Sequence, residues 1–170
     1  MHRADRRTMV ANQENQAIMK ISTPLPVANK LLAALSRADY QRVAGDLQVV
    51  TLEFGEVLYE QGATIKFVYF PIDSLVSLLT VVDRHLALEV GMVGREGMVG
   101  VAFALGIGTS PFRAMVQGAG TALRMKAAPF RRELGANPQL RRKLDLYVHT
   151  LMAKIAQTAA RARSVHNAHF

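Results

Sequence analysis

The 170-residue chain is predicted to be mainly β, with an antiparallel β-roll, short flanking helices and one long C-terminal helix. Three observations predict this fold class. About seven short β-rich segments, separated by glycine or proline turns, lie between residues 47 and 125, which is typical of a roll or sandwich. A pattern typical of a helix start, Ser36 to Asp39, precedes this region. After residue 139 no glycine or proline interrupts a helical spacing of apolar residues.

The composition is that of a globular protein, with 50% hydrophobic and 20% charged residues. The chain has no cysteine, which excludes disulfides, thiolate metal sites and cysteine nucleophiles. The net charge of +8 is uneven: residues 24–130 carry nine basic and nine acidic residues, whereas residues 131–170 carry eight and two. Such a basic segment either binds an anionic partner or is a solvated helix face, and its alternation with apolar positions favours the solvated face.

The N-terminal region divides into a leader and two short helices. Residues 1–23 are polar, without a signal-peptide core, and are predicted to be a mobile leader. No run reaches the length of a membrane span, so we expect a cytoplasmic protein with no membrane contact. Residues 27–35 are predicted to form a helix. Ser36 to Asp39 resembles a capping box, and a second helix is expected from there to Gly45.

The roll itself is assigned to residues 24–136. Asp83 to His85 is expected to form a tight hairpin between two of its strands. Strands are predicted at residues 47–52, 57–59, 67–70, 75–82, 86–93, 112–117 and 121–125.

The last segment, residues 137–170, is predicted to be one helix that begins at Asn137-Pro138. Its length of roughly 45 Å exceeds what a small roll covers. The economical partner is a second copy of the chain, and the alternative is that the helix packs only on its own domain. The predicted dimerisation positions have the 4-3 spacing of a heptad seam and are Leu144, Val148, Leu151, Ile155, Thr158, Ala162 and Val165.

Catalytic and metal chemistry find little support. The five histidines are scattered, and His166 with His169 supplies only two potential ligands for a metal. Glu53, Glu56 and Glu60 fit exposed positions in strands and turns. We therefore expect neither an enzyme nor a metal site.

The stretch from Val93 to Val116 is the most informative. Glycines at 94, 97 and 100 allow close backbone approach, and a helical turn starting at Gly100 would direct free amides outward. Arg113 is the only charged residue between Gly97 and Leu123. Two explanations stay open: Arg113 pairs with a buried acid, or it binds an anionic ligand such as phosphate.

These features together resemble the cyclic-nucleotide-binding domain of the Crp–Fnr transcription regulators, over roughly residues 28–170. The motifs that carry the resemblance are Phe54-Gly55-Glu56, Glu60-Gln61-Gly62, Tyr69-Phe70-Pro71, Val76-Ser77-Leu78 and Gly94-Arg95-Glu96-Gly97-Met98-Val99-Gly100. The resemblance implies an eight-stranded jelly roll, a phosphate-binding cassette and a long dimerisation helix.

The resemblance also implies a ligand site made of Gly100, Val101, Ala102, Arg113, Ala114 and Thr158. In cyclic-AMP-binding members a glutamate stands at the position of Val101 and a hydroxyl residue at that of Ala114. An unpaired ribose hydroxyl would cost about 1–3 kcal/mol, so cyclic AMP is expected to bind poorly. The adenine-facing hydroxyls of those members fall near Ile155 and Ala156, with Thr158 as the nearest substitute.

Family members read DNA with a helix-turn-helix module after the long helix, and this chain stops at Phe170, so we expect no sequence-specific DNA binding by it alone. No obligatory cofactor is expected. The first hypothesis is an effector-sensing, dimerising module for a cyclic nucleotide or another small anionic effector. The second is a structural dimerisation module in which Arg113 is paired internally.

Overall fold

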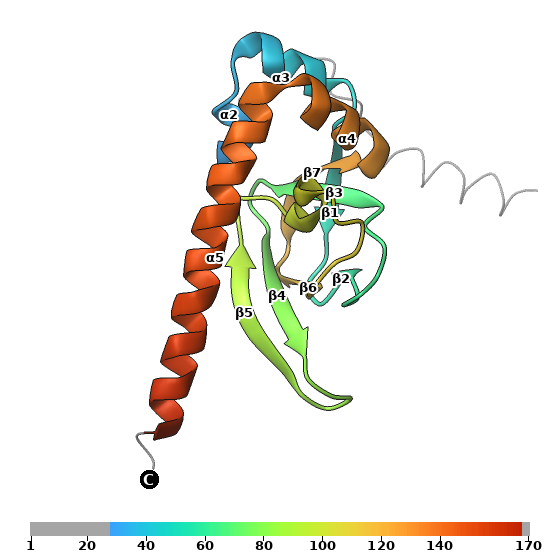
Figure 1. Ribbon diagram of the computed structural model, residues 1–170. Coiled ribbons are helices and arrows are strands. Elements are labelled where there is room, and N and C mark those ends of the chain that lie inside the picture. The colour runs from blue at the N-terminus through green and yellow to red at the C-terminus, as the bar shows by residue number, and fades with distance from the viewer. Residues whose placement is uncertain (1–27, 168–170) are drawn as a thin grey trace, which may run out of the picture.

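The computed structural model describes residues 28–167, with side chains through residue 162. The β-roll lies beside one long helix, and shorter helices cover the roll at the end where that helix begins (Figure 1). The predicted leader, residues 1–23, lies outside the described residues. None of the described helices is both long and apolar enough to cross a membrane.

Two short helices lead into the roll. Helix α2 spans Lys30–Ala33 and is shorter than the predicted 27–35, because its cap is Asn29, whose side-chain oxygen accepts from the Leu31 and Leu32 amides. Helix α3 spans Arg37–Ala44. Its predicted cap is confirmed, since the Asp39 amide donates to Ser36 Oγ at 3.1 Å.

The roll consists of two antiparallel sheets that are ordered β1-β7-β3 and β2-β6-β4-β5. All seven predicted strands are present, and no end is shifted by more than one residue. The described residues form these seven strands rather than the eight that the resemblance implied. The predicted hairpin between β4 and β5 is confirmed, because Asp83 Oδ1 accepts from the amides of His85 and Leu86. The strands are β1 (Gln48–Leu52), β2 (Val57–Tyr59), β3 (Phe67–Pro71), β4 (Leu75–Val81), β5 (Ala87–Val93), β6 (Arg113–Gly118) and β7 (Gly120–Lys126).

Helix α4, Ala127–Ala136, was not predicted from the sequence. Pro129 and Gly135 lower the helix propensity of this segment, so the sequence pattern did not predict a helix. A proline in the first turn of a helix is nevertheless tolerated, because it removes no intrahelical hydrogen bond. The pair Phe130 and Leu134, spaced by four residues, was the available indication, and both are buried. The Phe130 ring packs edge-on against Phe70, with 6.3 Å between ring centroids. The helix therefore closes the end of the roll.

Helix α5 spans Pro138–Asn167. Its predicted cap is confirmed, because Asn137 Oδ1 accepts from the Leu140 amide at 2.9 Å. Leu144 and Leu151 of the predicted dimerisation seam are buried in the roll of the same protomer. Val148, Ile155 and Thr158 are half-buried, Ala162 is exposed, and Val165 lies beyond the described side chains. The first part of the seam therefore packs on its own domain, which was the alternative that the sequence left open.

Candidate functional site

A turn at residues 94–97 anchors the region that leads into the cassette. Glu96 Oε1 accepts from the Gly94 amide at 3.2 Å, and Asn29 Nδ2 donates to the carbonyls of Pro71 and Gly97. Asn29 is fully buried, so these hydrogen bonds also satisfy a polar group that would otherwise be costly. The turn is thus fixed to α2 and to the end of β3.

The same turn contacts α5 through Gly97. A Cβ at Gly97 would lie 2.2 Å from the hydroxyl oxygen of Tyr147, so only glycine leaves room for that ring. Burial raises the pKa of Tyr147 well above its usual value, and the phenol stays neutral. Lys154 Nζ lies 3.9 Å from Glu96 Oε1 and adds a weak, exposed ion pair. The residues just before the cassette therefore pack directly on the long helix.

Gly100 begins the predicted helical turn, which is the 3₁₀ helix η1, Val101–Leu105. Its φ of +95° is a left-handed conformation that disfavours other residues, and a Cβ there would lie 2.7 Å from the Tyr59 hydroxyl. The expectation of a short helix after Gly100 is confirmed.

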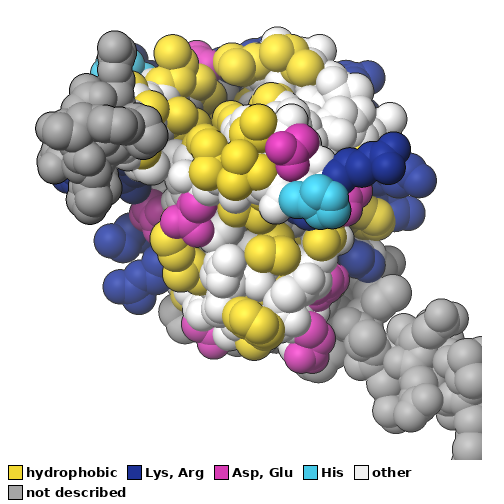
Figure 2. Space-filling view, turned by 90° about the horizontal axis from the view of Figure 1, so that it is seen from below, with side chains coloured by type: hydrophobic (Ala, Val, Ile, Leu, Met, Phe, Trp, Pro, Cys, Tyr) yellow, Lys and Arg dark blue, Asp and Glu magenta, His cyan; other side chains and the backbone are white. Residues whose placement is uncertain are grey.

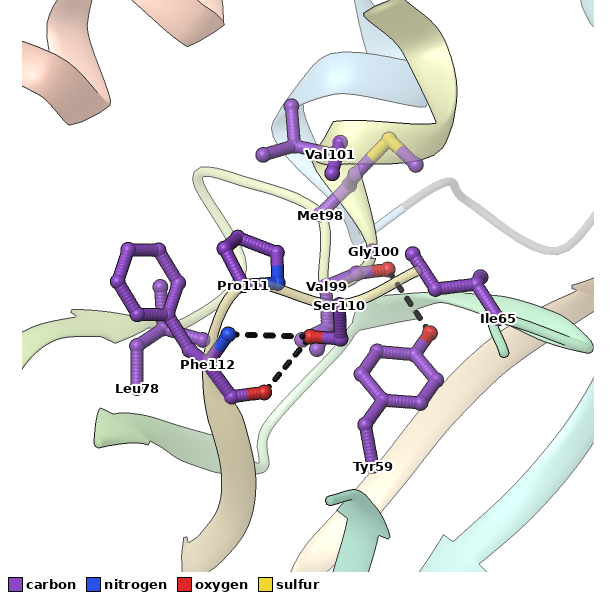
Figure 3. A pocket seen from close by; sticks show the side chains of 11 residues that line it. Tyr59, Ile65, Leu78, Met98, Val99, Gly100, Val101, Ser110, Pro111 and Phe112 are labelled. Atoms are coloured by element: carbon purple, nitrogen blue, oxygen red, sulfur yellow. Dashed lines mark hydrogen bonds between the residues drawn. The ribbon is translucent and has the colours of Figure 1, made fainter. Parts of the chain in front are cut away.

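A small pocket lies between η1 and the start of β6 (Figure 3). It offers about 30 Å³ to the centres of water-sized molecules, which is room for one or two waters. The lining residues carry no charge and are mostly apolar: Tyr59, Ile65, Leu78, Met98, Val99, Gly100, Val101, Ala102, Ser110, Pro111 and Phe112.

The polar side chains in this lining already have partners. The Tyr59 hydroxyl donates to the Phe67 carbonyl, and burial raises its pKa well above the usual value, so it stays protonated. Ser110 Oγ donates to the Phe112 carbonyl at 2.7 Å. Both hydroxyls are used within the fold, which leaves the pocket with little capacity to recognise a polar ligand.

Arg113 is not among the residues that line the pocket. Its Nε lies 2.8 Å from Glu60 Oε2, and the two side chains are 35% and 57% exposed. The sequence left two partners open for Arg113, a buried acid or an anionic ligand. In the structure its partner is an acid, Glu60, which lies at the surface as expected from the sequence. An ion pair this exposed contributes at most about 1 kcal/mol.

The structure thus brings together only part of the predicted ligand site. Gly100, Val101 and Ala102 line the pocket. Ala114 is fully buried in β6, and Thr158 on α5 donates its hydroxyl to the Lys154 carbonyl. Sequence reasoning missed Tyr59, Leu78 and Phe112 as pocket walls. Alternation within the strands hinted at their inward orientation, but only the pairing of β2, β6 and β4 brings them together.

No metal site was expected. Within residues 28–162, no three His, Asp or Glu side chains come together in a way that could hold a metal ion. His166 and His169, the pair considered above, lie outside the described side chains.

Comparison with known proteins identifies the fold. No protein-family model matches the chain, and no curated protein matches it. Among solved structures, it is similar to a cyclic-nucleotide-binding domain from Methylobacillus flagellatus KT (TM-score 0.62, 10% identity, 79% of this chain and 80% of that one). It is also similar to the sensor domain of the transcriptional regulator DNR from Pseudomonas aeruginosa (0.58, 17%, 73% and 88%).

A third match is the c-di-GMP-responsive global regulator CLP of Xanthomonas campestris (TM-score 0.64, 13% identity, 78% of this chain and 72% of that one). Regulatory subunits of a cAMP-independent protein kinase A from Trypanosoma brucei are longer, and the chain covers 47% and 48% of them. At these identities the similarity shows the fold alone. The chain has the β-roll fold of cyclic-nucleotide-binding domains and Crp–Fnr-type regulator domains, as the sequence predicted.

Proposed function

We propose that this chain is the regulatory, dimerising module of a Crp–Fnr-type transcription regulator, with a cassette that does not accept cyclic AMP as cyclic-AMP-binding members do. Two of the matched proteins are regulators by name, which supports a regulatory rather than a catalytic role. The observation that carries the exclusion of cyclic AMP is the pocket at η1, whose lining is uncharged and which has room for one or two waters.

For the effector we propose a small anion that binds at Arg113. The exposed Glu60 carboxylate stands where such an anion would bind, and an exposed ion pair costs little to exchange. A guanidinium has five N–H donors in a fixed plane, which suits phosphate or carboxylate.

The same ion pair favours a second candidate, a module that senses nothing. In that case Glu60 is the permanent partner of Arg113, and the roll serves only to hold α5. The two candidates differ in what happens when Glu60 loses its charge.

Isothermal titration with cyclic AMP, phosphate and a panel of acyclic nucleotides separates these candidates. A sensor should bind an anion more tightly in the Glu60→Gln variant and lose binding in Arg113→Leu. A module that senses nothing should bind none of these compounds in any variant. Low-micromolar binding of cyclic AMP to the native chain would contradict the proposed reading of the cassette.

For dimerisation we propose the face of α5 that points away from the roll. Leu146 and Met152 are 59% and 65% exposed there, and Ala153 and Ala156 are exposed beside them. Hydrophobic side chains also gather among acidic ones on the face seen from below (Figure 2). Val82, Leu86 and Leu88 are also exposed at the β4–β5 hairpin, but the tip of this hairpin curves away from α5 and does not extend its outward face (Figure 1). A second copy is the economical cover for the exposed apolar side chains of α5.

Sedimentation of the native chain and of Met152→Arg tests the dimer. The native chain should be dimeric at tens of micromolar, and the variant should be monomeric, with an unchanged melting temperature at concentrations below the dimer range. Phe54→Arg is the matched control, because Phe54 is equally exposed on the β1–β2 turn. A native chain that is monomeric at tens of micromolar would contradict the proposed dimer. Leu151→Arg would not be a clean test, since Leu151 is buried in its own roll and a charge there would unfold it.

A further inference from the structure

Two apolar side chains project from the end of η1 and from the loop that follows it. Leu105 and Ile107 are 53% and 51% exposed, and neither belongs to the pocket lining or to α5. The loop between them is well defined: the Gly106 amide donates to the Phe103 carbonyl, and the Ile107 amide donates to the Ala102 carbonyl, each at 3.1 Å. These are exposed apolar groups in fixed positions rather than at the end of a loose segment.

Two arginines are held beside this loop. The Arg131 guanidinium of α4 lies 4.8 Å from the centroid of the Phe103 ring, and Arg141 of α5 donates to the Ala104 carbonyl at 3.0 Å. Each of these contacts leaves other N–H donors of the guanidinium free to face outward. Side chains that are already ordered lose less entropy when a partner binds. We call Leu105, Ile107, Arg131 and Arg141 the η1 tip.

The surroundings of the η1 tip are basic. Residues 126–145 hold six basic residues and two acids, Glu133 and Asp145. Asp145 is exposed one helical turn after Arg141, so it offsets part of the charge of that arginine. Glu133 is largely covered and lies 3.7 Å from Arg42, so it does not offset the charge of the tip. Residues 97–112 carry no charge at all. The result is an apolar centre with arginines at its margin.

From this arrangement we infer that the η1 tip docks an acidic segment of a partner protein. An apolar side chain of the partner packs on Leu105 and Ile107, and its carboxylates pair with Arg131 and Arg141. A nucleic acid would use the arginines but would have no need of the apolar pair. The chain's own first 23 residues carry four basic and two acidic residues, so their charge does not complement the tip.

The surface is small, which predicts a transient contact with a few dominant residues rather than a permanent interface. This inference is independent of the proposed effector and of the dimer, because it uses neither the pocket nor the exposed face of α5.

The test is to pan a random dodecapeptide display library on the native full chain and to measure the affinity of the recovered peptides by titration. The recovered peptides should share acidic residues around one or two apolar ones. Ile107→Ser and Arg131→Glu should each weaken their binding by at least tenfold. Phe54→Ser and Arg84→Glu make the same chemical changes at other exposed sites and should leave the affinity unchanged.

Thermal melting of each variant keeps the result interpretable, and Arg141→Gln replaces Arg131→Glu if the latter does not fold. Neutral or basic peptides, or affinities that the tip variants leave unchanged, would overturn the inference. A 20-base-pair duplex that binds the native chain, loses affinity in Arg131→Glu and keeps it in Ile107→Ser would also overturn it, and would assign the tip to nucleic acid.

Discussion

The two faces of helix α5 carry similar residues but have different surroundings. On one face Leu144, Tyr147 and Leu151 are buried against the roll, and Tyr147 packs into the space that Gly97 leaves. On the other face Leu146 and Met152 are more than half exposed. The 4-3 spacing picked out the first face, but it left open whether the protomer itself or a second copy covers that face. What differs is whether the protomer itself supplies a surface against which the side chain can pack.

This difference shows which part of the long helix belongs to the domain core. The roll buries the face whose side chains meet the Gly94–Gly97 turn and β5, where Ile155 comes within 3.6 Å of a Cβ position at Gly91. The other face is available for a second molecule, so substitutions there should change association rather than folding.

The largest expected difference between the two faces of α5 comes from truncating one leucine on each face. Leu144→Ala leaves a cavity in the core and should lower the free energy of unfolding by about 2–5 kcal/mol. Leu146→Ala should change the stability of the monomer by less than about 0.5 kcal/mol. Urea unfolding of both variants at a protein concentration below the dimer range measures the difference. Equal losses in the two variants would show that the two faces are not distinct.

Filling the space at Gly97 should have the next largest effect. A methyl group there would overlap the hydroxyl oxygen and the ring of Tyr147, so Gly97→Ala should lower the free energy of unfolding by about 1–3 kcal/mol. In the double variant Gly97→Ala/Tyr147→Ala the two losses should be clearly less than additive. Additive losses in urea unfolding would mean that the ring and the turn do not restrain each other.

The buried tyrosines Tyr59 and Tyr147 make the free energy of unfolding depend on pH. Burial raises the pKa of both Tyr59 and Tyr147, so the folded state keeps protons that the unfolded chain releases above about pH 10. Stability should therefore be independent of these groups below pH 10 and should fall as the pH rises above it.

Tyr59→Phe isolates one of these contributions. The variant should lose about 1 kcal/mol at neutral pH, because its hydrogen bond to the Phe67 carbonyl is gone, but its stability should fall less steeply above pH 10. Urea unfolding between pH 7 and 11 measures both slopes. Identical slopes in the native chain and the variant would show that Tyr59 ionises normally in the fold.

Much of the fold was predictable because its determinants are local. Ser36 and Asn137 each cap a helix at the predicted residue, and Asp83 closes the predicted hairpin. Hydrogen bonds between residues two or three apart need no tertiary context, so the sequence pattern is sufficient. Helix α4 was missed because Pro129 and Gly135 reduce its local helix propensity, while burial of Phe130 stabilises it.

The candidate site was predictable only in part. The glycine that opens η1 was identified, because a left-handed turn favours this residue type. The partner of Arg113 was not identified, because Glu60 lies 53 residues away and reaches it only through the pairing of β2 with β6. The same pairing puts Tyr59 beside Ala114 and narrows the pocket.

The sequence by itself determined the seven strands, the helices other than α4, two helix caps, the hairpin and the basic charge of residues 131–170. Each of these depends on residue type and short spacing. Only the tertiary structure decided that the roll of the same protomer buries the first part of the α5 seam, that Arg113 pairs with an exposed acid, and that the pocket at η1 is small and apolar. These depend on the volumes and distances between side chains from distant segments, which a one-dimensional pattern does not specify.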